Sequence, residues 1–302
     1  MVTGSDRAMR GLKAGVVVTC LLALAMFWCL GGGTAAGYVL QGPFVLELMA
    51  KKLEGASTLK VTQQVTIEDP TVSAEPLTLS ETLSYIFPSQ FRSEMVYQDS
   101  QRIHVVSHGQ ELTIVDGRIT AAPDGRFDRY KDLLLYNSDR LLYKTLAENG
   151  VDVGVCSLGH SGDQIVYVIG ARYPDDSVSQ LWVDKDEFLP LRWLTVRQSP
   201  GASEPGDRWE FVYTGWQKVD GVFYPFNIQT YHNGQHIRSI RVSKVDANAV
   251  IDAQSMDIAH LRALYREPEP PPAVQQQSQP DGRPGVEEAQ PAIEGTKRKI
   301  KP

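Results

Sequence analysis

The amino-acid sequence predicts a mainly β protein with some α: about ten antiparallel strands, enough for a strongly curved sheet or an open barrel, and a few helices. Apolar and polar residues alternate with period two through several segments, which is typical of strands that bury one face. Asp-Gly and Asn-Gly pairs separate such segments at short intervals, as in tight hairpins, so consecutive strands are expected to pair antiparallel. Helical periodicity is confined to two places.

The first 36 residues have the order of a secretory signal. Three basic residues precede an apolar run at 14–30, then come three glycines and Thr34-Ala35-Ala36, the small side chains that a signal peptidase requires. Cleavage is therefore predicted after Ala36, which leaves the protein in the periplasm or cell envelope. The alternative is an uncleaved inner-membrane anchor, because the run reaches the lower end of the ~17–25 residues that span a bilayer.

A first helix is predicted over 43–53, because Pro43 suits a first helical turn, apolar residues recur on one side, and Gly55 follows. Alternating strands are expected at 59–67, 77–87, 91–97, 165–173 and 208–214. The turn pairs between the strands are His108-Gly109, Asp116-Gly117, Asp220-Gly221 and Asn233-Gly234. Two short helices are predicted within 127–149, because Asn137-Ser138 can end one helix and cap the next.

One domain is expected over 37–266, followed by a tail at 267–302. From Glu267 onward the chain is rich in proline and glutamine and has almost no large apolar residues. Such a composition buries too little surface to offset the entropy lost on ordering, so the tail is predicted to be disordered.

Cysteine count and charge exclude several classes of function. Cys20 and Cys29 leave with the signal, so Cys156 is alone in the mature chain, which excludes internal disulfides and zinc sites built from cysteine pairs. The net charge of −6 becomes more negative when three basic residues and one acidic residue are removed. An acidic chain has no electrostatic footprint for nucleic acid. We expect no metal, no cofactor and no nucleic-acid partner.

Two patterns have a distant likeness to catalytic motifs. Gly159-His160-Ser161-Gly162-Asp163 has an aspartate where the G-x-S-x-G nucleophile elbow needs its last glycine, and it lies between two strand-like segments. His232 and His236 are separated by Asn233-Gly234, which favours a turn over a pair of metal ligands. Both stretches are interpreted as hairpin turns, and no enzymatic activity is expected.

Several motifs over roughly 44–258 resemble the LolA-like family of periplasmic lipoprotein carriers and outer-membrane lipoprotein-sorting proteins, a fold shared by RseB-type regulators. Pro88-Ser89-Gln90-Phe91-Arg92 is similar to the family's Pro-x-x-Phe turn, and Val106-Ser107-His108-Gly109-Gln110 to its following hairpin. The stretches 181–192 and 218–225 are similar to its later hairpins. In the carriers an arginine precedes that proline and ties the lid; here that position is Phe87.

The resemblance implies an incomplete, half-open barrel whose concave face is covered by short helices and holds acyl chains. The implied function is a non-catalytic carrier or binder of lipid or lipid-modified protein, with acyl chains or lipoproteins, and an inner- or outer-membrane protein, as partners. The alternative is an envelope-stress sensor that binds another protein through the same fold. The candidate cavity and lid residues are Leu79, Leu83, Tyr85, Phe87, Phe91, Met95, Leu133, Leu134, Leu142, Leu146, Trp193, Trp209, Phe211 and Tyr213.

Amino-terminal sequencing of the protein from its native envelope tests the cleavage site. We expect the mature chain to begin at Gly37, because the small residues before it suit the peptidase. A chain that retains Met1 would show that the apolar run serves as an anchor.

Overall fold

The computed structural model describes residues 39–120, 128–136, 138–197 and 206–265. All of them belong to one compact unit. The predicted signal at 1–36 and tail at 267–302 lie outside the described residues. Within the described ranges, no helix has the length and apolarity needed to cross a membrane.

Thirteen strands form a single antiparallel sheet, three more than the sequence analysis counted. The first six are β1 (Thr58–Ile67), β2 (Leu77–Ile86), β3 (Gln90–Tyr97), β4 (Ser100–Ser107), β5 (Gln110–Val115) and β6 (Arg118–Ile119). The other seven are β7 (Cys156–Ser161), β8 (Gln164–Ile169), β9 (Gln180–Asp184), β10 (Pro190–Arg197), β11 (Asp207–Val219), β12 (Val222–His232) and β13 (Gln235–Ala247).

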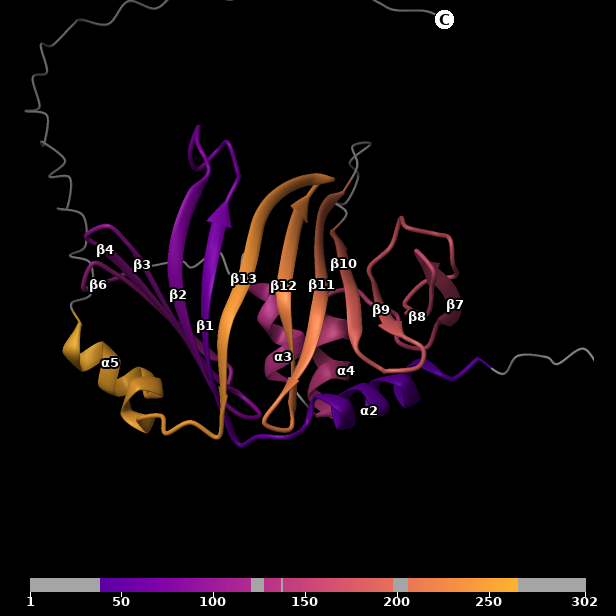
Figure 1. Cartoon of the computed structure of the whole chain (residues 1–302), viewed down its shortest axis with the longest axis horizontal. Helices are drawn as coiled ribbons and strands as arrows, with labels where there is room; N and C mark the ends of the chain where they lie inside the picture. Colours follow the sequence, from indigo (N-terminus) through magenta and orange to yellow (C-terminus); the bar gives the residue numbers. More distant parts are fainter. Residues whose placement is uncertain (1–38, 121–127, 137, 198–205, 266–302) are drawn as a thin grey trace, which may run out of the picture. The chain divides into compact units, whose positions relative to one another are not determined.

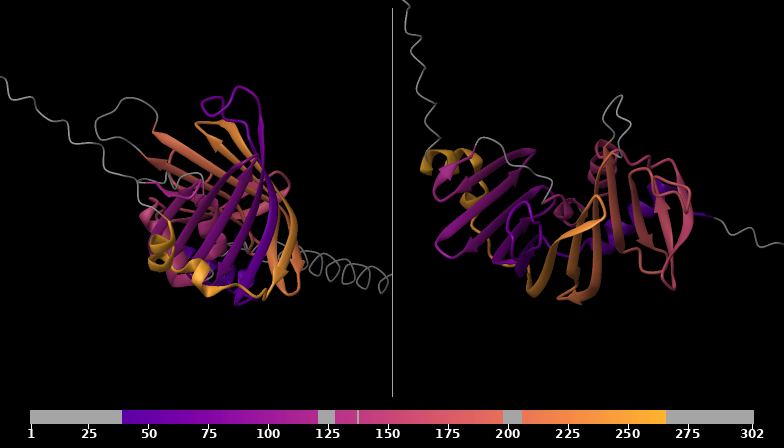
Figure 2. Two further views of the ribbon diagram at one scale, coloured as in Figure 1. Left: turned by 90° about the vertical axis from the view of Figure 1, so that its left-hand side faces the viewer. Right: turned by 90° about the horizontal axis from the view of Figure 1, so that it is seen from above.

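The strand order is β6-β5-β4-β3-β2-β1-β13-β12-β11-β10-β9-β8-β7. Each strand pairs with its neighbour in sequence, except where β1 pairs with β13 and joins two meanders. The sheet is not closed, because β6 and β7 lie at its two ends. Figures 1 and 2 show it strongly curved, as predicted for a half-open barrel.

The hairpin turns were predicted from their sequences. His108, Asp116, Asp220 and Asn233, each followed by glycine, have φ between 48° and 50°, and the glycines are also at positive φ. Positive φ at both central residues is the geometry of a type I′ turn, whose twist matches the flanking strands. The turns therefore fix the register of four hairpins. The stretch 162–163 is also a turn, between β7 and β8, as expected for the Ser161 motif.

Helices α2 (Gly42–Leu53), α3 (Asp132–Leu135) and α4 (Asp139–Glu148) confirm both predicted helical regions. The Ser138 side chain accepts a hydrogen bond from the Leu141 N–H, which caps α4, and the chain leaves at Gly150 with positive φ. A 3-10 turn, η1 (Arg129–Lys131), leads into α3. Because α3 and α4 lie in the connection from β6 to β7, this connection joins the two ends of the open sheet. We call residues 128–148, which carry η1, α3 and α4, the cover.

The main core lies between the concave face of the sheet and the three helices (Figures 1 and 2). It contains Val45, Met49 and Leu53 of α2, together with inward-facing residues of eleven strands. Burial alternates along the strands, as in β1, where Leu59 and Val61 are buried and Lys60 is exposed. Hydrophobic burial on this one face therefore holds the curved sheet and helices together.

A second, smaller core lies on the outer face of β4 and β5, where the sequence analysis predicted no helix. A 3-10 turn, η2 (Ala253–Met256), and helix α5 (Ile258–Leu264) cover it, with Ile258 and Leu261 buried against Ile103, Val105, Leu112 and Ile114. Seven residues make about two turns, which is too short for a helical period to be established from the sequence. The strand predicted over 165–173 also ends earlier, at Ile169, because Gly170 has φ +103°.

Replacing Leu261 by alanine should lower the free energy of unfolding by about 2 to 4 kcal/mol, because its side chain is buried in the outer core. Leu264→Ala is the control on the same helix, since Leu264 is 63% exposed and should change stability by less than about 0.5 kcal/mol. Equal effects in urea denaturation would show that α5 does not pack on the sheet.

Candidate binding face and its polar ladder

The structure gathers all candidate cavity and lid residues into the main core. Phe87 and Met95 are half-buried at its border, and the others are buried. On the sheet they are Leu79, Leu83 and Tyr85 of β2, Phe91 and Met95 of β3, Trp193 of β10, and Trp209, Phe211 and Tyr213 of β11; on the cover they are Leu133 and Leu134 of α3 and Leu142 and Leu146 of α4.

Aromatic side chains line much of this face. Tyr85 on β2 and Tyr224 on β12 meet above the two strands between them, with their hydroxyl oxygens 3.0 Å apart. The rings of Trp193 and Phe211 lie 5.8 Å apart, centre to centre. Phe87, at the position where the resembled carriers have arginine, stacks on Tyr85 at 5.7 Å. Rings of this size offer large apolar area, the common lining of ligand sites.

The cover fills the concave face in this structure. Leu133, Leu142 and Leu146 are fully buried, and Leu134 is 6% exposed. Any acyl chain that reaches the aromatic residues must therefore displace these leucines. The cover pairs with no strand, so its displacement would break no backbone hydrogen bond between strands of the sheet.

A row of polar residues crosses the apolar face from β1 to β5. We call Gln63, Glu81, Ser93, His104 and Thr113 the polar ladder. Gln63 pairs with Glu81 across β1 and β2, Ser93 with His104, and His104 with Thr113.

The ladder is hydrogen-bonded along its length. The Gln63 amide donates to Glu81 at 2.6 Å, and the Ser93 hydroxyl donates to the same carboxylate at 2.5 Å. His104 Nδ1 lies 2.9 Å from the Thr113 hydroxyl. Two buried atoms, Gln63 Oε1 and His104 Nε2, have no hydrogen-bond partner within the described part of the chain. Buried polar atoms usually have partners, so the ladder has unused capacity for polar contacts.

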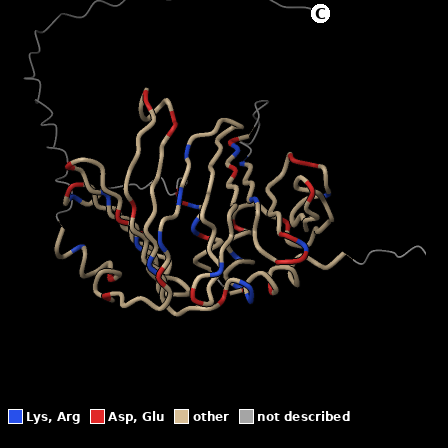
Figure 3. Tube along the Cα trace, in the orientation of Figure 1, with Lys and Arg blue, Asp and Glu red and all other residues tan. Residues whose placement is uncertain are grey.

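Asp128, at the start of the cover, is held by two arginines of the sheet. Arg102 on β4 contacts its Oδ2 at 2.6 Å, and Arg238 on β13 approaches its Oδ1 at 3.4 Å. Arg238 also lies 3.4 Å from Glu81, which connects this carboxylate to the polar ladder. Asp128, Arg238 and Glu81 are almost completely buried. Figure 3 shows basic and acidic positions spread along the strands and their connections.

Residues 129–131 add further contacts between the cover and the sheet. The Tyr130 hydroxyl accepts from Gln63 at 3.1 Å, its carbonyl accepts from Tyr213 at 2.9 Å, and its ring lies under Arg238. The Arg129 guanidinium donates to Thr195, and the Lys131 ammonium lies over the Phe91 ring. Residues 128–131 are therefore the anchor of the cover, and we use that name for them.

Electrostatics keep the anchor carboxylate charged. Burial by itself would raise the pKa of Asp128, but the Arg102 and Arg238 guanidiniums hold that pKa well below its usual value. Burial lowers the pKa of His104 from 6.5 to about 4, with Lys131 and Arg102 acting in the same direction and Asp128 opposing them. His104 is therefore neutral near pH 7.

Neither the polar ladder nor the anchor was predicted from the sequence. Gln63, Glu81 and Ser93 each occupy the apolar phase of their strand, between apolar neighbours two positions away. One such interruption looks incidental, but three in consecutive strands were a usable signal. The sequence carries no comparable signal for Arg102, Asp128 and Arg238, because only the strand order brings these three residues together.

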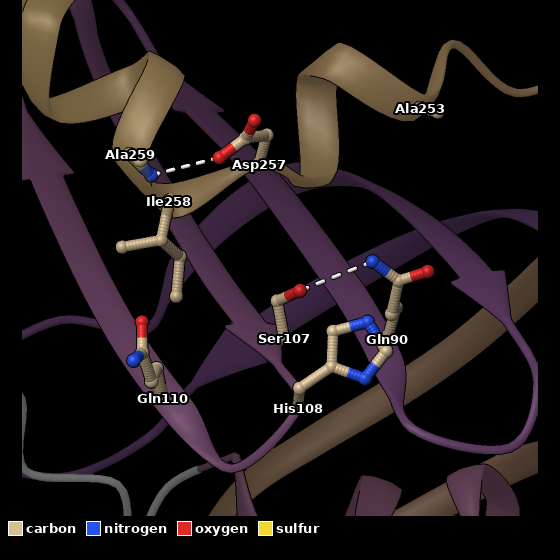
Figure 4. A pocket seen from close by; sticks show the side chains of 8 residues that line it. All are labelled: Gln90, Ser107, His108, Gln110, Ala253, Asp257, Ile258 and Ala259. Carbon is tan, nitrogen blue, oxygen red and sulfur yellow. Dashed lines mark hydrogen bonds between the residues drawn. The ribbon is translucent and has the colours of Figure 1, made fainter.

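A separate hollow of about 410 Å³ lies on the outer face, between α5 and the β3–β5 turns (Figure 4). Most of its lining is polar, and Asp257 caps α5 by accepting a hydrogen bond from the Ala259 N–H. The lining residues are Gln90, Ser107, His108, Gln110, Ala253, Asp257, Ile258 and Ala259. None of the candidate cavity residues contributes to it. Among the described residues, no three His, Cys, Asp or Glu side chains are grouped to hold a metal ion.

No protein-family model matches the chain, and no curated protein matches it in sequence. It is similar in structure to an outer membrane lipoprotein-sorting protein domain from Vibrio parahaemolyticus, with 12% identity, 73% of this chain and 97% of the other covered, and a TM-score of 0.48. It is also similar to a DUF1329 family protein from Desulfovibrio piger, with 12% identity and a TM-score of 0.47. The match covers 73% of this chain and 98% of the other.

A third similar structure is a LolA superfamily protein from Nitrosomonas europaea, with 12% identity and a TM-score of 0.44. The match covers 72% of this chain and 98% of the other.

The depressed pKa of His104 predicts a pH dependence of stability. In the unfolded chain His104 binds a proton below about pH 6.5, whereas in the folded protein it stays neutral until about pH 4. As the pH falls from 6.5 to 4, the free energy of unfolding should therefore decrease by about 3 kcal/mol. His104→Gln should remove this component, and the control His160→Gln, at an exposed position, should keep it. Urea denaturation measured from pH 4 to pH 7 that shows the same slope in both variants would refute the assignment.

Proposed function

We propose that this protein is a non-catalytic binder of acyl chains, carried by a lipid or a lipid-modified protein, outside the cytoplasm. The observation that carries the proposal is the apolar, aromatic concave face closed by two short helices that take no part in the sheet. A face of this kind suits a ligand that has many CH2 groups and few polar ones.

The magnitudes support an exchange between cover and ligand. Burying a leucine side chain contributes about 1.5–3 kcal/mol, so the five buried leucines of the cover, which include Leu135, contribute roughly 8–15 kcal/mol. A 12-carbon acyl chain that buries its ten CH2 groups at about 0.8 kcal/mol each recovers roughly 8 kcal/mol. The two quantities are of the same size, so an acyl chain can replace the cover without a large net cost.

The predicted signal supports a location in the periplasm or cell envelope, where acyl chains must cross water between membranes. Native mass spectrometry of protein taken from the envelope tests the proposal. A lipid or acylated protein that co-purifies supports it. A lipid-free protein that co-purifies with a membrane protein and binds no fatty acid would instead favour the regulator hypothesis.

Replacing Leu142 by alanine separates stability from binding. The closed form should lose about 2 to 4 kcal/mol, because Leu142 is fully buried under α4. The ligand-bound form, with the cover displaced, should lose less, so a fluorescent fatty acid should bind about tenfold more tightly although the protein melts at a lower temperature.

Tyr143→Ala is the matched control on the same helix. Tyr143 is 50% exposed, so neither melting temperature nor affinity should change much. If Leu142→Ala stays folded but binds the probe more weakly than the wild type, the cover and the ligand do not compete.

A further inference from the structure

Displacing the cover changes the charge balance of the concave face. In the closed form the Asp128 carboxylate contacts Arg102 at 2.6 Å and Arg238 at 3.4 Å. Glu81 lies 3.4 Å from Arg238 and belongs to the sheet, so it remains when the cover moves. Asp128 leaves with the cover, and Asp128 is the carboxylate that Arg102 contacts.

In the open form Arg102 would have lost the carboxylate that it contacts, whereas Arg238 would keep Glu81. A guanidinium on an apolar face that has lost its carboxylate favours another anion, so the open form offers Arg102 as a site for one. A carboxylate or phosphate accepts the paired N–H groups of a guanidinium in the same way as Asp128 does.

We propose, on the basis of the proposed function, that the acyl ligand carries an anionic headgroup that takes the place of the Asp128 carboxylate beside Arg102 and Arg238. The unpartnered His104 Nε2 of the polar ladder lies on the same face, where the tautomer that carries its proton on Nε2 can donate to the headgroup, whereas the unpartnered Gln63 Oε1 only accepts and does not bind an anion. The anchor is then an internal competitor for the headgroup, and the ligand class is a fatty-acid anion or a phosphate-bearing lipid. A neutral ester or diacylglycerol fits less well.

Matched ligands test this assignment by displacement of a fluorescent fatty acid from the full-length protein. Dodecanoate and dodecyl phosphate should bind at least about tenfold more tightly than methyl dodecanoate, which has a similar chain and no charge. Acetate and inorganic phosphate at millimolar concentration should not displace the probe. Displacement by these free anions would show a site for small anions and overturn the headgroup assignment.

Variants locate the headgroup. Arg102→Gln should bring the ratio of acid to ester affinity close to one, because Arg102 is the charge left without Asp128; its side chain is 27% exposed, so the substitution is tolerable. Arg102→Lys should restore part of the ratio. Arg241→Gln is the control, since Arg241 is an exposed arginine on β13, and it should leave the ratio unchanged.

The outcomes separate the two proposals. If the protein binds neither the acid nor the ester, the proposed function itself fails. If it binds both equally well, the acyl-binding function stands and the headgroup assignment is overturned. A tenfold preference that survives Arg102→Gln also overturns it, because Arg102 would then have no part in recognition.

Discussion

The contact of the Asp128 carboxylate with Arg102 and Arg238 holds the cover on the sheet, and the closed form of the concave face depends on it. Asp128 belongs to the cover, whereas Arg102 lies on β4 and Arg238 on β13, two strands on opposite sides of β1. A buried ion pair loses solvation energy, and apolar residues of the same volume are often as stabilising. Removing one partner, however, costs about 3 to 5 kcal/mol. Such a contact stabilises one arrangement strongly and yields to another anion.

The sheet supplies the fixed part of the molecule. Its neighbouring strands all pair antiparallel, and the β1–β13 pairing connects the first and last strands in sequence. The cover, in contrast, pairs with no strand and contacts the sheet through leucines over the aromatic face and the anchor over the polar ladder. This division suits the proposed exchange, in which the sheet stays fixed and the cover is displaced. Departure of the cover would break no strand pair.

The alternation of apolar residues, the Asx-Gly turns and the cover helices were predictable from the sequence, because each depends on neighbours within a few residues. The candidate residues on β2, β10 and β11 were predictable for the same reason. Strand order was not, and the anchor depends on it, since Arg238 reaches Asp128 only because β13 pairs with β1. Two register shifts leave an extra residue in β13, one opposite β1 and one opposite β12, and change the alternation locally, as at Ile237 and Arg238, which are adjacent and both buried. Phe87 shows the limit of a family resemblance: the arginines that hold the cover here are at 102 and 238.

Amide hydrogen exchange with and without dodecanoate measures most directly whether a ligand replaces the cover. If it does, the amides of α3 and α4 should exchange faster when the ligand is bound, because these helices leave the sheet, while those of β1 and β13 should be unchanged or slower. Ligand bound at saturation with unchanged exchange in both helices would contradict the account, because the acyl chain would then lie somewhere other than the concave face under the cover.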